Sequence, residues 1–146
     1  MARDTVTRNT TLRRAVIVHD LPQALAALAA AQKLNRPIRL HTPHGAASCA
    51  GAGYFQKIAE LAHRQYPDVD AVFVLDCGAS PGQALGAIRT GWKHIRLDAK
   101  RAALAKVADI AEQASATLDT GTTPTLDLLE TPDPESAAIA WLKRRR

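Results

Sequence analysis

Histidine, aspartate and cysteine side chains stand at the ends of short apolar segments in this sequence. His19 follows the first segment, His41 closes the second, and Asp76 and Cys77 come at the end of the third. Side chains of these types transfer protons, attack carbonyl groups or ligate metal ions in enzymes. We therefore expect Asp76, His41, His19 and Cys77 to be the catalytic residues of this chain.

Aspartates in such positions have a second explanation, because they also cap helices. Asp20 and Asp98 each stand directly before a segment with helical periodicity, so we expect both to accept hydrogen bonds from free amides at a helix N-terminus. Asp76 stands several residues before the next helical pattern, which favours a functional role.

The cysteines allow two interpretations. Cys77 follows an apolar segment, near the start of a predicted helix and near His41 if the two strands are neighbours, and such surroundings lower the pKa of a thiol. Cys49 lies in a glycine-rich loop and is the weaker nucleophile candidate. The alternative for both is a buried, unreactive thiol.

A metal ion is a further alternative. The donors of His19, His41, His44 and Asp76 suit zinc, iron or manganese, but the sequence has no CxxC or HExxH motif. The sequence therefore assigns neither a metal nor any other cofactor.

Two glycine-rich loops, at residues 42–53 and 77–82, precede segments with helical periodicity. Backbone amides at such positions bind anions, which predicts a small-molecule ligand with a phosphate or carboxylate group. The alternative is that the glycines only form turns, and neither loop has a nucleotide-binding fingerprint. The ligand-binding candidates are His44, Gly45, Ser48, Gly51, Gly53, Gly78 and Ser80.

The chain contains an internal repeat. Segment 15–20 matches 71–76, and Ile-Arg-Leu occurs at both 38–40 and 95–97, with similar helical segments between and after them. The matched blocks change their spacing at loops 42–53 and 77–82, so we expect these two loops to meet and form the ligand site. Arg39 and Arg96 hold equivalent places in the repeat. If they point toward a helix-covered face, each needs a carboxylate partner, and we expect a structural salt bridge.

Runs rich in β-branched residues alternate with the helical segments. They predict strands at 15–18, 38–41, 71–75 and 95–98, with a fifth at 116–119, then a loop and a last helix from about residue 134. The predicted fold class is α/β, with a parallel sheet built from a duplicated (βα)2 unit. Two arrangements stay open: an open doubly wound, flavodoxin-like sheet and half of a (βα)8 barrel.

Length and composition indicate one domain. The chain has 146 residues, of which 47% are hydrophobic, 4% aromatic and 29 are alanines. We divide it into a basic, flexible N-terminal segment (1–14), an α/β domain (15–119), and a Thr/Pro-rich loop with a C-terminal helix (120–146) that belongs to the same domain.

The net charge of +5 arises at the two ends, because residues 15–142 hold 11 Lys or Arg and 13 Asp or Glu. Few aromatics and no basic core make nucleic acid an unfavoured partner. No apolar run reaches the roughly 18 residues of a membrane span, and no leader precedes the first strand, so we expect a cytoplasmic protein.

We also expect a homodimer. An alanine-rich core leaves a strand edge with Ile38 and Leu40 open, and Ile139, Trp141 and Leu142 present apolar groups on two sides of the last helix. The alternative is that this helix folds back over its own sheet.

The combined prediction is a small-molecule enzyme of unidentified reaction, with its site at the carboxyl edge of the sheet. The alternatives are a non-catalytic ligand-binding or regulatory module, and an interaction protein that uses its basic termini. A Schiff-base aldolase is disfavoured, because no lysine ends a predicted strand.

Overall fold

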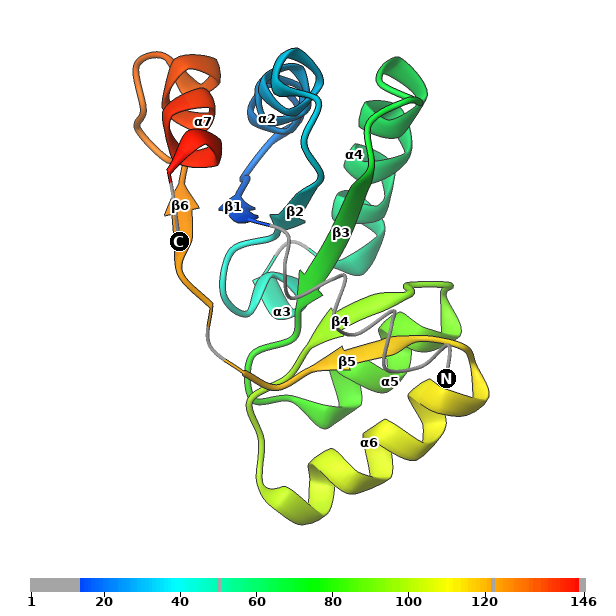
Figure 1. Cartoon of the computed structure of the whole chain (residues 1–146). Coiled ribbons are helices and arrows are strands. Elements are labelled where there is room, and N and C mark those ends of the chain that lie inside the picture. The colour runs from blue at the N-terminus through cyan, green and yellow to red at the C-terminus, as the bar shows by residue number, and fades with distance from the viewer. Residues whose placement is uncertain (1–13, 50, 122, 145–146) are drawn as a thin grey trace. The chain divides into compact units, whose positions relative to one another are not determined.

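Strands and helices alternate along the chain in the computed structural model, which describes residues 14–49, 51–121 and 123–144. The predicted α/β class with parallel strands is confirmed. The basic segment 1–14, apart from Arg14, lies outside the described residues. In chain order the elements are β1 (Arg14–Ile17), α2 (Leu21–Leu34), β2 (Ile38–His41), α3 (Ala46–Cys49), α4 (Ala52–Gln65), β3 (Ala71–Asp76), α5 (Pro81–Arg89), β4 (His94–Arg96), α6 (Arg101–Gln113), β5 (Thr117–Asp119), β6 (Thr125–Asp127) and α7 (Pro134–Lys143) (Figure 1).

The chain divides into two compact units. The first contains Met1–His41, Lys57–Phe73 and Thr123–Arg146, and the second contains Thr42–Gln56 and Val74–Thr122. Strand β3 contributes its first half to the first unit and its second half to the second. We describe each unit separately.

The strands of the first unit follow the order β3-β2-β1-β6. β1 pairs in parallel with both β2 and β6, so that Val16 lies opposite Leu40 and Leu126. On the other side of β2, the Ile38 amide donates to Asp70 O at 3.0 Å, just before β3. β2 therefore has a neighbour on each side, and the expectation of an open edge at Ile38 and Leu40 is wrong.

Helix α2 follows from its sequence. Ala24, Ala27, Leu28 and Ala31 recur at helical spacing and are buried, and Asp20 caps the helix by accepting from the Gln23 amide at 2.9 Å. The predicted cap at Asp20 is thus confirmed.

Helix α7 packs beside α2 in the first unit, as Figure 1 shows. Its buried side chains are Ala138 and Leu142, four residues apart, and the Trp141 indole N–H donates to Ala15 O at 3.0 Å. The last helix therefore folds back over its own sheet, so Trp141 gives no reason to expect a dimer.

The second unit orders its strands β3-β4-β5, all parallel. Leu75, Ile95 and Leu118 are in register, as are the next residues along each strand, Asp76, Arg96 and Asp119. Because side chains alternate between the faces of a strand, these are an apolar row and a charged row on opposite faces.

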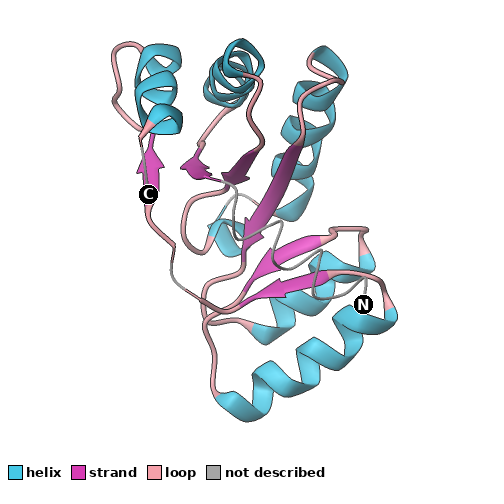
Figure 2. Cartoon of the chain, in the orientation of Figure 1, coloured by secondary structure: helices cyan, strands magenta, loops and turns pink. Residues whose placement is uncertain are grey.

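Helices α5 and α6 contact each other and lie on the same side of these strands (Figure 2). Ser80 caps α5 by accepting from the Gln83 amide, whereas Lys100, the N-cap residue of α6, makes no side-chain cap hydrogen bond. The predicted cap at Asp98 is therefore wrong, since α6 begins three residues after it.

The element order β-α-β-α occurs twice, as the repeat predicts. In the first unit β1, β2 and β3 are adjacent in chain order, an arrangement found both in (βα) barrels and in doubly wound sheets. A flavodoxin-like order would place β1 between β2 and β3. No described helix has the length and hydropathy needed to cross a membrane.

Candidate active site

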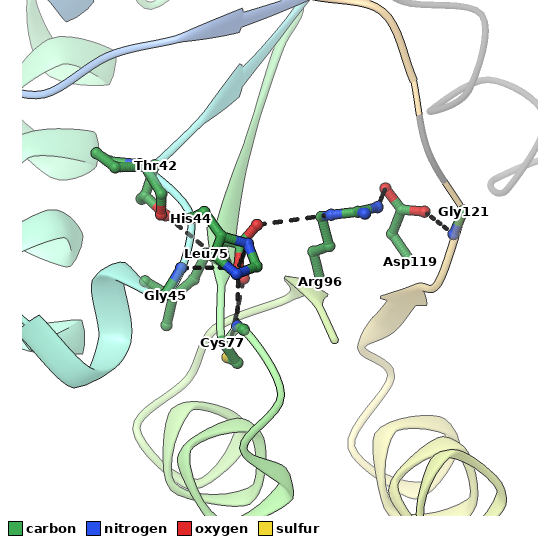
Figure 3. Close-up of polar contacts among 11 residues, drawn as sticks. Thr42, His44, Gly45, Leu75, Cys77, Arg96, Asp119 and Gly121 are labelled. Carbon is green, nitrogen blue, oxygen red and sulfur yellow. Dashed lines mark hydrogen bonds and ion pairs between the residues drawn. The ribbon is translucent and has the colours of Figure 1, made fainter. Parts of the chain in front are cut away.

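Three charged side chains close neighbouring parallel strands of the second unit. Asp76, Arg96 and Asp119 are the last residues of β3, β4 and β5. Arg96 Nε lies 3.5 Å from Asp76 Oδ2, and Arg96 Nη1 lies 4.0 Å from Asp119 Oδ2 (Figure 3). The expected carboxylate partner of Arg96 is thus confirmed. Arg39, its counterpart in the repeat, is completely buried in β2.

The Asp76 carboxylate joins the two glycine-rich loops. Its Oδ1 accepts from the amides of Gly45 at 3.0 Å and Gly78 at 2.8 Å, and lies 3.5 Å from His44 Nδ1. The Asp76 amide in turn donates to Thr42 Oγ1 at 2.9 Å. Loops 42–53 and 77–82 therefore meet at the end of β3, as their spacing predicts.

Glycine is required where the loops touch. Gly45 and Gly78 have φ angles of 67° and 57°, a region that residues with a side chain seldom adopt. A Cβ atom on Gly78 would also lie 3.4 Å from Gly45 Cα. Both glycines thus allow their amides to point at one carboxylate oxygen.

Cys77 is a buried free thiol beside this carboxylate. Burial, with a smaller contribution from the charge of Asp76, raises the pKa of Cys77 to about 12. Its thiol points to Leu75 O, 3.9 Å from Sγ. The expectation of a lowered pKa is wrong, because an apolar environment and a neighbouring negative charge both disfavour the thiolate.

The remaining loop candidates lie in the second unit in other roles. Ser80 is the N-cap of α5, Ser48 is an exposed residue of α3, Gly51 has a φ of 88° just before α4, and Gly53 stands in the first turn of α4. Within the described residues, Asp76 has no hydrogen bond to any of these four.

His19 and His41 belong to the first unit. His19 Nε2 lies 2.7 Å from Asp127 Oδ1, and His41 is buried at the end of β2. The contacts described above for the Asp76 carboxylate come from residues of the second unit.

A metal site is not evident among the residues that the structure describes. In the part of the chain that the structure describes, no three His, Cys, Asp or Glu side chains are placed together as metal ligands. The donors proposed from the sequence, His19, His41, His44 and Asp76, are divided between the two units.

An open cavity of about 560 Å³ lies at the starts of α5 and α6. It shares Ala79 and Pro81 with loop 77–82, and Asp98 and Lys100 are the charged residues among its described lining. A small ligand can therefore enter the second unit beside the loop that holds the Asp76 carboxylate.

Sequence reasoning missed Arg96 and Asp119 as site residues. The predicted strand 95–98 ends two residues later than β4, so that Asp98 and not Arg96 stood at its predicted end. A signal for Asp119 was its place as the last residue of the predicted strand 116–119.

Comparison with known protein families identifies the family to which this sequence belongs. Residues 4–119 match the sequence model of the family described as fructose-bisphosphate aldolase class-II. The chain belongs to this family. The matched region contains Asp76, Arg96 and Asp119, and it ends with β5, so β6 and α7 lie beyond it.

The sequence is also similar to those of individual fructose-bisphosphate aldolases. The chain is 31% identical over 81 residues to a fructose-bisphosphate aldolase of Xanthobacter flavus, covering 56% of this chain and 23% of that protein. It is 29% identical over 89 residues to the fructose-bisphosphate aldolase class 2 of Synechocystis sp., covering 61% of this chain and 25% of that protein. The aligned part thus spans about a quarter of these relatives.

Proposed function

We propose that this member of the aldolase family is a small-molecule enzyme that cleaves or forms a carbon–carbon bond next to a carbonyl group. The observation that carries the proposal is the contact of Asp76 with Arg96 at the carboxyl edge of parallel strands, within the region that matches the family. In parallel α/β proteins this edge is where ligands bind.

The pair supplies the two functions that an aldol cleavage needs. The Asp76 carboxylate takes the proton of the hydroxyl group on the β-carbon, whose oxygen forms the new aldehyde as the carbon–carbon bond breaks. The bonding electrons move to the α-carbon and its carbonyl oxygen as an enolate, whose charge the Arg96 guanidinium neutralises. The proton then returns to the α-carbon.

The charges of the site also indicate the ligand class. Arg96 is held only at 3.5 and 4.0 Å by its two carboxylates, so its N–H groups retain capacity for an anionic ligand group. Lys100 at the cavity adds a second cation. We therefore propose a small hydroxy-carbonyl substrate with a phosphate or carboxylate group.

The test is turnover of a panel of β-hydroxy carbonyl compounds with and without a phosphate group, followed by trapping the released aldehyde. We expect cleavage of phosphorylated members, with a rate about 100-fold lower in Asp76→Asn and a higher KM in Arg96→Gln. Asp109→Asn, on the exposed surface of α6, is the matched control and should behave as wild type. Equal rates in Asp76→Asn and wild type would overturn the proposal.

A non-catalytic ligand-binding module is the second candidate. It is favoured by the engagement of Asp76 Oδ1 with two amides, which gives this carboxylate a structural role. Saturable binding of the phosphorylated compounds without any aldehyde release would establish this function instead.

We further propose a cytoplasmic homodimer. A buried free Cys77 suits a reducing compartment. β6 in the first unit and β5 in the second are end strands in the described strand order, so each has a backbone edge that a second copy could pair with.

A further inference from the structure

An imidazole and a carboxylate form a close pair at the carboxyl ends of β1 and β6 in the first unit. His19 Nε2 lies 2.7 Å from Asp127 Oδ1. The two strands are parallel neighbours, and Asp127, the last residue of β6, is in register with Ile17, the last residue of β1. The pair thus stands on the edge of the sheet where ligands bind in this class of fold.

Backbone contacts hold both partners in place. The His19 amide donates to Gln23 Oε1 at 2.8 Å, and Asp127 Oδ1 also accepts from the Leu129 amide at 2.9 Å. Because a carboxylate only accepts hydrogen bonds, the neutral form of the imidazole carries its hydrogen on Nε2 in this contact. Nδ1 then has the lone pair of a base, and a proton taken there gives an imidazolium that Asp127 stabilises.

The pair remains accessible. The His19 side chain is 24% exposed and that of Asp127 is 48% exposed, so a small molecule can reach the imidazole. Asp127 also lies outside residues 4–119, the part of the chain that matches the aldolase family. The pair is therefore a feature of this chain that the family match does not explain.

We propose that His19 and Asp127 form a second acid–base site, separate from the one proposed at Asp76. His19 Nδ1 accepts a proton from water or from the hydroxyl group of a small ligand, while Asp127 orients the ring. With the carboxylates of Asp20 and Asp127 both at this edge, the site suits a neutral ligand better than an anionic one.

Hydrolysis of 4-nitrophenyl acetate, a neutral activated ester, is the probe. Water attacks the ester carbonyl as its proton passes to His19 Nδ1, 4-nitrophenolate leaves with the bonding electrons, and the imidazolium releases the proton to solvent. We expect the full-length chain to hydrolyse the ester faster than His19→Gln and Asp127→Asn do, by about tenfold or more. His63→Gln changes an exposed histidine of α4 and should retain the wild-type rate.

A variant that fails to fold would also lose activity, so a second measurement uses the unmodified protein. Nitrogen-15 NMR of the imidazole of His19 should show hydrogen on Nε2 and none on Nδ1. Hydrogen on Nδ1, or equal ester hydrolysis in wild type, His19→Gln and Asp127→Asn, would overturn the proposal and leave the pair a structural contact. Neither readout uses an aldol substrate, so failure here is independent of the proposed aldolase activity.

Discussion

Asp76 is the residue on which both loops of the proposed site depend. Replacing it with alanine leaves the part-buried Gly45 amide and the buried Gly78 amide without their acceptor, and an unsatisfied buried group costs about 1–3 kcal/mol. Asn keeps an oxygen at the Oδ1 position and should preserve most of this stability. Urea unfolding measures the difference, and equal stabilities of Asp76→Ala and Asp76→Asn would show that the carboxylate does not hold the loops.

Cys77 should be unreactive in the folded protein. Burial raises the pKa of the thiol to about 12, so the native state favours the neutral form. The corresponding stability is present below the ordinary pKa of about 8.5 and is lost as the pH rises toward 12. We expect the free energy of unfolding to fall more steeply over this range in wild type than in Cys77→Ala.

Thiol-specific reagents give an independent measurement on the same residue. Labelling of Cys77 at pH 8 should occur only with unfolding, and Cys49 should be followed separately by peptide mass spectrometry. Rapid labelling of Cys77 in the native protein would contradict its buried, neutral state.

At this scale the sequence predicted part of the cluster around Asp76, whose functional role stays a prediction. Asp76 was recognisable because it follows a continuous apolar strand and precedes a glycine-rich loop. Its partner Arg96 was not, because residues 95–97 read as one strand whether it ends at 96 or 98, and only strand register shows that Arg96 lies opposite Asp76. Cys77 was misjudged since burial, rather than a helix N-terminus, controls its thiol.

At the scale of elements, two aspartates near helix starts should differ in their contributions. Asp20 caps α2, whereas α6 begins after Lys100 without a side-chain cap hydrogen bond. We expect Asp20→Ala to lower the free energy of unfolding by about 1 kcal/mol and Asp98→Ala to have an effect within about 0.5 kcal/mol. Thermal or urea unfolding of the two variants checks this, and equal losses would refute the assigned caps.

The packing of α7 on α2 is a second prediction about elements. Leu142 is 1% exposed, so Leu142→Ala should destabilise the protein by about 2–5 kcal/mol. Leu129, which is 53% exposed just after β6, is the matched control and should change stability little on replacement by alanine. A small effect of Leu142→Ala would contradict docking of α7 in the first unit.

Most helices and strands were predictable because the spacing of their apolar residues is clear. The helix predicted from about residue 134 corresponds to α7. β6 was missed. Its sequence, Thr125-Leu126-Asp127, is too short for alternation to stand out and lies in a Thr/Pro-rich stretch that reads as a loop. The signal was its identity with Thr117-Leu118-Asp119 in β5, but only pairing with β1 makes these three residues a strand.

At the scale of the whole molecule, the proposed homodimer rests on the backbone edges of β5 and β6. Light scattering at micromolar concentration should give about twice the 15.7 kDa mass of the chain. A mass near 15.7 kDa throughout the concentration range would reject the dimer.

The carboxyl edge of the second unit is proposed to bind a small anionic carbonyl compound beside the Asp76–Arg96 pair. Proton–nitrogen NMR of the full chain, titrated with a short hydroxy-ketone phosphate, tests it most directly. We predict saturable shifts concentrated at the amides of Gly45 and Gly78 and at Arg96 Nε, and much smaller shifts with the unphosphorylated ketone. Shifts concentrated at the amino ends of the strands, or none at these three groups, would contradict the claim.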